Sequence, residues 1–122
     1  MIGTDFLSLP NMLKTYLFLF IAIVFEIIAT SSLKASEQFS KLWPSVITIA
    51  GYIAAFYFLS LSLNKLNLGI AYAIWSGVGI VVISIVGLLL FKQKLDLPAI
   101  IGIALIVCGV VVINVFSKTA SH

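Results

Sequence analysis

One carboxylate, that of Glu26, stands inside a long apolar stretch whose nearest charged residues are Lys14 and Lys34. The other acids all fall near the ends of apolar runs: Asp5, Glu37 and Asp96. An ionised carboxylate close to mid-bilayer costs about 2.5–3.5 kcal/mol on insertion scales, so such groups usually mark the path of an ion or substrate. The chemistry of this protein is therefore predicted to run through one carboxyl group per chain.

The residues on the helical face of Glu26 are small enough to leave room around its carboxylate. In a helix, residues three, four and seven apart share a face, which places Ala22 and Thr30 beside Glu26. A ligand or another helix could therefore approach the acid. A packing seam of small residues would explain Ala22 and Thr30 equally well, but it does not explain Glu26.

Aromatic residues recur in the next two apolar runs at spacings that share a helix face. Tyr52 and Phe56 lie four residues apart, and Tyr72 and Trp75 lie three apart. A carboxylate lined by aromatic rings suits a lipophilic cation, because charge attraction is joined by a cation–π attraction of about 0.5–2 kcal/mol per ring. Taken singly, each ring is better explained by packing or by anchoring at the membrane surface, and only the combination with Glu26 favours a binding site.

Two pairs of glycines lie inside the third and fourth apolar runs. Gly77 and Gly79 fall in the middle of the third run, where glycine weakens a helix by about 1 kcal/mol and permits a bend. A hinge and close helix packing are both open readings of this pair. Gly102 and Gly109 share one face of the fourth run, and small residues at that spacing favour close contact between helices. The fourth run is therefore predicted to form a dimer contact.

The elements that must position these residues are membrane-spanning helices. The chain of 122 residues is 62% hydrophobic and 9% charged, against about 25% charged residues in a soluble domain. Crossing a bilayer takes roughly 20 helical residues, and continuous apolar runs without alternation favour helices over barrel strands. We predict an all-α integral membrane protein whose transmembrane domain, residues 13–118, has spans at about 13–33, 43–63, 68–91 and 95–116.

The rest of the chain carries no predicted chemistry. Residues 1–12 are interpreted as an N-terminal leader or a cloning remnant, and residues 119–122 as a tail. Cys108 is the only cysteine, and the sequence has no cluster of cysteine and histidine that would hold a metal. No cofactor is predicted. An enzyme is not predicted either, because the sequence offers no second catalytic group to act with Glu26. The net charge of +3 comes from lysines at the ends of the spans, which suits anionic lipid headgroups and not nucleic acid.

The lysines give almost no bias for the orientation of the chain, which lysine and arginine in short loops normally set. Three of them would lie on one side of the membrane: Lys14, Lys65 and Lys118. Four would lie on the other: Lys34, Lys41, Lys92 and Lys94. This near balance predicts insertion in both directions, although one lysine or flanking lipid contacts could still decide. Two oppositely oriented copies would form a unit like the inverted repeats of larger transporters.

At these residues the sequence resembles the small multidrug resistance family of membrane transporters. The resemblance covers about residues 13–117 and is carried by four stretches: Phe25–Lys34, Leu42–Ser45, Gly69–Val81 and Leu95–Ile101. In combination these stretches are highly specific. The residues after Glu26, Ile27 to Thr30, fit the drug-exporting branch of the family better than the branch that exports guanidinium.

The resemblance implies antiparallel homodimers of four-helix protomers in the bacterial plasma (inner) membrane. It implies proton-coupled export of quaternary ammonium and other lipophilic cations by alternating access, with Glu26 as the shared proton and drug site. The aromatic residues around that site would be Tyr16, Tyr52, Phe56, Tyr72 and Trp75. Because proton and cation would compete for one acid, the proton gradient supplies the energy and no nucleotide motif is needed.

Other functions of such a chain remain open. A guanidinium exporter of the same fold would carry a smaller and more hydrophilic substrate. A non-transporting membrane assembly subunit would use Glu26 only to pair with a partner helix, and would keep its function when Glu26 is replaced. A subunit that needs a paralogue is a third possibility, although paralogue pairs usually show opposite charge biases and this chain shows neither.

Overall fold

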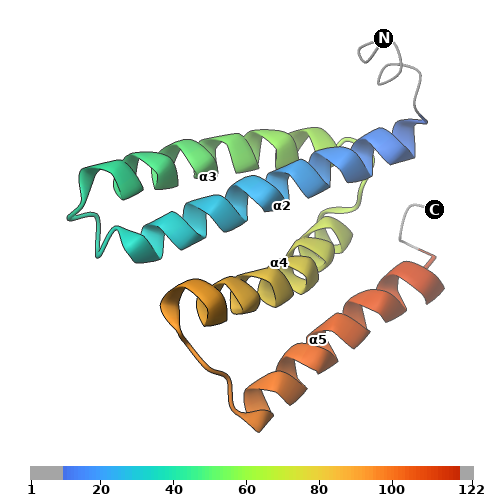
Figure 1. Cartoon of the computed structure of the whole chain (residues 1–122). Coiled ribbons are helices and arrows are strands. Elements are labelled where there is room, and N and C mark those ends of the chain that lie inside the picture. Colours follow the sequence, from blue (N-terminus) through green and yellow to red (C-terminus); the bar gives the residue numbers. More distant parts are fainter. Residues whose placement is uncertain (1–9, 119–122) are drawn as a thin grey trace.

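The computed structural model describes residues 10–118 as four α-helices (Figure 1). They are α2 (Asn11–Ala35), α3 (Leu42–Ser62), α4 (Leu68–Phe91) and α5 (Leu97–Phe116). Each is long and apolar enough to cross a membrane, which confirms the prediction of an all-α chain with four spans. The predicted leader and tail lie largely outside the described residues, although Asn11 and Met12 already belong to α2.

The ends of the helices differ from the predicted spans by no more than two residues. The difference has a clear physical cause at the fourth span, which begins at Leu97 and not at Leu95. The Asp96 carboxylate accepts a hydrogen bond from the backbone N–H of Ala99 at 3.1 Å, and a proline follows in the first turn. A side-chain cap of this kind satisfies a backbone donor at the helix start, so Asp96 fixes where α5 begins.

Helices α2 and α3 form an antiparallel pair with a short connection, lying side by side in Figure 1. Small residues lie in this contact, since Gly51 of α3 approaches Ala29 of α2 and Ala29 and Ala55 are fully buried. Lipid gives helices no hydrophobic reason to associate, so small residues that let backbones approach closely are favoured at such contacts.

The turn between α2 and α3 has an unusual backbone. Glu37, Gln38 and Phe39 all have positive φ angles, of 49°, 64° and 65°. The hydroxyl of Ser36 holds this turn, because it donates to the Leu33 carbonyl at 2.7 Å and accepts from the backbone N–H of Phe39 at 3.0 Å. The turn reverses the chain within a few residues and sets α3 against α2.

Gly51 sets the distance between α2 and α3. A Cβ added to Gly51 would lie 2.9 Å from Ala29 Cβ and 3.2 Å from the Phe25 carbonyl oxygen. We therefore expect Gly51→Ala to destabilise the protein by about 1–3 kcal/mol, the usual cost of overpacking. The measurement is thermal unfolding in detergent micelles. The control is Gly69→Ala, where the added Cβ meets only Asn67 Oδ1, at 3.4 Å; equal stability of the two variants would contradict the expectation.

Helix α5 packs mainly on α4 and lies away from α2 and α3 (Figure 1). Within Leu97–Phe116 no residue is buried in the single chain. The contact with α4 is tight at one point, since a Cβ added to Gly77 would lie 2.7 Å from Val110 Cγ2. Gly77 thus lies at a close helix contact, the alternative to a hinge, and its role as a hinge stays a prediction. A Cβ added to Gly102 or Gly109 would meet no described atom within 4 Å apart from its chain neighbours and the backbone of its own helix.

Candidate functional site

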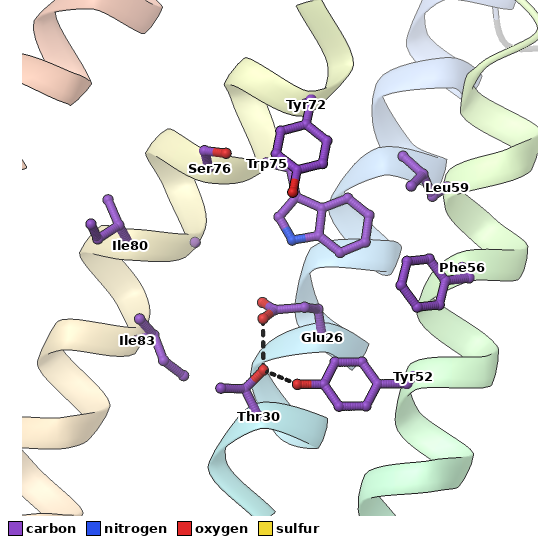
Figure 2. Close-up of a pocket in the computed structure, with 11 residues that line it drawn as sticks. Glu26, Thr30, Tyr52, Phe56, Leu59, Tyr72, Trp75, Ser76, Ile80 and Ile83 are labelled. Atoms are coloured by element: carbon purple, nitrogen blue, oxygen red, sulfur yellow. Dashed lines mark hydrogen bonds between the residues drawn. The ribbon is translucent and has the colours of Figure 1, made fainter. Parts of the chain in front are cut away.

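A cavity of about 380 Å³ opens between α2, α3 and α4 (Figure 2). Among the described residues, none from α5 lines it. Its lining contains six of the residues predicted to bind the proton or cation, which are Glu26, Thr30, Tyr52, Phe56, Tyr72 and Trp75. The other lining residues are Leu59, Ser76, Gly79, Ile80 and Ile83. Three helices therefore bring the predicted acid and the predicted rings together.

The carboxylate of Glu26 is held from one side. The hydroxyl of Thr30 donates to Glu26 Oε1 at 2.7 Å, and the same hydroxyl oxygen lies 2.7 Å from the Tyr52 hydroxyl. Figure 2 shows this line of three polar groups running from α2 to α3. The other carboxylate oxygen, Oε2, faces Gly79 of α4, where even an added Cβ would lie 3.9 Å away. Glu26 and Gly79 both line the cavity.

Aromatic rings form the wall that connects α3 to α4. The ring of Phe56 lies 6.1 Å from that of Trp75 and 6.3 Å from that of Tyr52, centre to centre. Phe56 is 59% exposed and Tyr72 is 66% exposed in the single chain. The cavity is therefore open on the side of these two rings.

Two predicted site residues do not line the cavity of the single chain. Tyr16 packs against a buried apolar cluster that includes Leu19 and Ile23 of its own helix. Ala22 is 0% exposed and belongs to the close-packed part of α2. Ala22 shares a helix face with Glu26 and Thr30, as predicted, but α2 is rotated so that this face is buried at Ala22 and open to the cavity only at Glu26 and Thr30. The predicted role of both residues in ligand binding stays a prediction.

Sequence reasoning missed four residues of the lining that helical periodicity could have found. Ser76, Ile80 and Ile83 follow Tyr72 at intervals of three or four residues on α4. Leu59 follows Phe56 by three residues on α3. They extend the two aromatic faces already identified, so continuing each stripe to the next turn would have included them.

The cavity can hold one positive charge. Among the described residues that line it, Glu26 is the one acid, and none is a lysine or arginine. Across residues 10–118 there is no group of three residues of the kind that holds a metal ion. A bound cation would meet the carboxylate on one side and ring faces on the other, and a proton would neutralise the same carboxylate.

The sequence profile of the family described as Small Multidrug Resistance protein matches residues 14–106. The chain belongs to the small multidrug resistance family. The predicted resemblance is thereby confirmed.

Known bacterial proteins are similar in sequence to this chain over most of its length. It is 56% identical over 110 residues to the quaternary ammonium compound-resistance protein QacE of Escherichia coli, which covers 90% of this chain and 100% of that protein. It is 51% identical over 110 residues, with the same coverage, to the multidrug transporter EmrE of Escherichia coli strain K12. QacG of a Staphylococcus species is 50% identical over 104 residues, 85% of this chain and 97% of that protein.

Membership of the small multidrug resistance family, together with four apolar helices, identifies a multi-pass protein of the bacterial inner membrane. The relatives are named as resistance proteins and transporters, which fits the expectation that this chain is not an enzyme.

Proposed function

We propose that this protein is a proton-coupled antiporter that exports lipophilic and quaternary ammonium cations, with Glu26 as the shared site of proton and cation. The observation that carries the proposal is the carboxylate of Glu26 in a cavity walled by aromatic rings between three helices. The names of the relatives support it, since they refer to multidrug transport and to resistance against quaternary ammonium compounds.

The cavity wall suits a cation that offers no hydrogen-bond donor. A quaternary ammonium group has no N–H, so it gains from charge and ring faces and needs no directed polar contact. Glu26 Oε2 supplies the charge, and the rings of Phe56 and Trp75 lie together across the cavity from α3 to α4. Pockets with few directed hydrogen bonds discriminate by shape and charge, so several cations of different shape would be accepted.

One carboxylate cannot bind a proton and a cation tightly at the same time. An incoming cation favours the ionised form of Glu26 and displaces its proton, and an incoming proton favours release of the cation. If the site opens to one side of the membrane at a time, each opening exchanges one ligand for the other. The proton gradient then drives the cation outward.

Gly77 and Gly79 lie where a bend in α4 would change the shape of the cavity. Gly79 lines the cavity beside Glu26 Oε2, and Gly77 contacts Val110 of α5. A bend between them would change the cavity and the contact with α5 together. We propose this pair as the hinge of alternating access.

An antiparallel homodimer would complete the site. The cavity is open where Phe56 and Tyr72 are exposed, and α5 presents Gly102 and Gly109 with free space around them. Small residues on an open helix face permit a second helix to approach closely. The balanced lysines supply the reason to propose that the second copy has the opposite orientation.

The test is transport by the purified protein alone. Proteoliposomes with an acidic interior should accumulate tetraphenylphosphonium, and a protonophore should abolish the uptake. Guanidinium serves as the competing substrate in the same assay. Preferential transport of guanidinium would favour the exporter of that ion, and absence of transport for both ions would favour an assembly subunit.

Trp75 should contribute directly to the binding of bulky cations. A cation–π contact is worth about 0.5–2 kcal/mol, so we expect Trp75→Ala to weaken tetraphenylphosphonium binding by about 2- to 30-fold, as measured by calorimetric titration. Proton binding should change less, because the hydroxyl of Thr30, and not the ring of Trp75, donates the hydrogen bond to Glu26 Oε1. The control is Trp43→Ala, at a residue 72% exposed and outside the cavity lining. Unchanged affinity in Trp75→Ala would mean that this ring serves only packing.

A further inference from the structure

Thr30 differs from the other threonines that the structure describes. The hydroxyl of Thr15 donates to the Asn11 carbonyl at 2.9 Å, and that of Thr48 donates to the Pro44 carbonyl at 2.8 Å. Both are the usual bond of a helical threonine to the carbonyl four residues earlier. Thr30 turns away from that bond and places its hydroxyl between two side chains (Figure 2).

The direction of these hydrogen bonds depends on the charge of Glu26. A hydroxyl has one hydrogen to donate, and an ionised carboxylate only accepts. With Glu26 ionised, Thr30 donates to Glu26 Oε1, so Tyr52 must be the donor in its contact with Thr30. The chain then runs from Tyr52 through Thr30 to Glu26.

A proton on Glu26 Oε1 reverses the chain. The carboxylic acid now donates to the oxygen of Thr30, whose own hydrogen turns to the oxygen of Tyr52. Tyr52 accepts this bond, and its own O–H is free to point into the cavity. No atom is gained or lost beyond the proton on Glu26, because each hydroxyl keeps one hydrogen and only rotates.

We propose that Thr30 is a positioning residue that transmits the protonation state of Glu26 to Tyr52. When Glu26 is ionised, Tyr52 presents only lone pairs to the cavity, which suits a cation. When Glu26 is protonated, Tyr52 presents a hydrogen, which repels one. The hydroxyl chain therefore adds a second polar group, on α3, that favours the cation or disfavours it in step with the acid on α2. The benefit of this link to cation transport rests on the proposed function, whereas the reversal of the hydrogen bonds does not.

Other titratable groups near the chain come from each neighbouring element. Tyr72 of α4 lines the same cavity, and Tyr52 is the group on α3. Lys34 of α2 lines a smaller cavity of about 140 Å³, which also includes Thr30. In the lining of both cavities, as far as the chain is described, α5 supplies no group. Tyr72→Phe therefore tests whether a neighbouring hydroxyl can replace the chain.

The experiment follows Tyr52 and Glu26 together by NMR in lipid bicelles. The protein carries ¹³C at the ζ carbon of tyrosine and the δ carbon of glutamate, with Tyr52→Phe and Glu26→Gln used to assign the signals. In the unmodified protein, and in Tyr72→Phe, both signals should shift with one midpoint as the pH changes. In Thr30→Val, Glu26 should still titrate while Tyr52 no longer follows it. Thr30→Ser, which keeps the hydroxyl, should restore the link, and Thr48→Val should leave it intact.

A pH profile of tetraphenylphosphonium binding provides the second readout. Thr30→Val removes the hydrogen bond that Glu26 Oε1 accepts, so the carboxylate should hold the cation less firmly. In Thr30→Val the midpoint of binding against pH should change, and affinity at pH 7 should be reduced by about tenfold, the usual scale for one hydrogen bond to a charged group. Tyr52→Phe should move the midpoint in the same direction, and adding it to Thr30→Val should change little.

A Tyr52 signal that still follows Glu26 in Thr30→Val would overturn the inference. If Thr30→Val does not fold, an unchanged binding midpoint in Tyr52→Phe would overturn it instead. Neither measurement requires transport. A protein that transports nothing but shows the linked titration would sink the proposed function and leave the inference standing, and active transport without the link would do the reverse.

Discussion

Replacing Glu26 by glutamine is expected to abolish gradient-driven export of cations while the protein still inserts and dimerises. Glutamine has nearly the same shape, and its amide oxygen can still accept the hydrogen bond that Thr30 donates to Oε1. It has neither charge nor a titratable proton. A cation about 4 Å from a carboxylate gains about 4 kcal/mol at an effective dielectric constant of 20, so affinity for tetraphenylphosphonium should fall by about a thousandfold.

The measurement for Glu26→Gln is uptake into proteoliposomes, with calorimetric titration of the cation. Glu37→Gln is the matched control, because Glu37 lies in the turn after α2, pairs with Lys41 at 3.2 Å and does not line the cavity. Uptake by Glu37→Gln should be normal. Gradient-driven uptake that survives in Glu26→Gln would show that the shared site lies elsewhere.

Locking the orientation of the chain is expected to destroy resistance, and mixing opposite locks is expected to restore it. The turn after α2 and the loop before α5 lie at one end of the helices, and the connection between α3 and α4 lies at the other (Figure 1). The lysines at these ends stand at three against four. Since an excess of lysine holds an end in the cytoplasm, small changes should tip this balance.

The structure indicates which positions can be changed for the locks. One variant combines Asn64→Lys with Lys92→Asn and Lys94→Gln. It has four lysines at the end of the α3–α4 connection and two at the opposite end. Asn suits position 92 because its φ angle is 56°, and Asn67 is spared because its side chain caps α4. The opposite variant carries Gln38→Lys and Gln93→Lys, which gives three against six.

Each locked variant expressed alone should leave cells as sensitive to quaternary ammonium compounds as cells without the protein. Both expressed together should restore growth. Orientation is measured by labelling a single cysteine placed in a loop, after replacement of the free and exposed Cys108. An unmodified protein that is labelled from one side only, and yet confers resistance, would exclude the antiparallel dimer in favour of a parallel one.

The helices could be predicted from sequence because the thickness of the membrane fixes the length of each apolar run. Residues of the cavity could be predicted where one helix alone decides which side chains share a face, as for Tyr52 and Phe56 or Tyr72 and Trp75. The rotation of α2 about its axis could not be predicted from sequence. It depends on the contact of Gly51 with Ala29, which joins two helices and produces no periodic pattern in the sequence of either. That rotation buries Ala22, and it also brings Thr30 to Tyr52.

The start of α5 and the position of Gly77 illustrate the same division. Asp96 followed by a proline is a local signal for a helix start, and capping rules applied to it would have placed the start at Leu97. Whether Gly77 faces another helix depends on where α5 lies, and sequence periodicity alone left packing and bending equally open. The close approach of Val110 is a tertiary feature.

The division of the cavity into a polar corner and broad apolar walls has a consequence for adaptation. We propose that energy coupling resides in Glu26 and its hydroxyl partners, whereas Leu59, Ile80 and Ile83 would only shape the space that a drug occupies. On this proposal, a single mutation in the walls would alter which antiseptics a bacterium survives and would leave the residues that use the proton gradient unchanged. Populations exposed to a new compound would then have a short evolutionary route to tolerance through substitutions of aliphatic side chains.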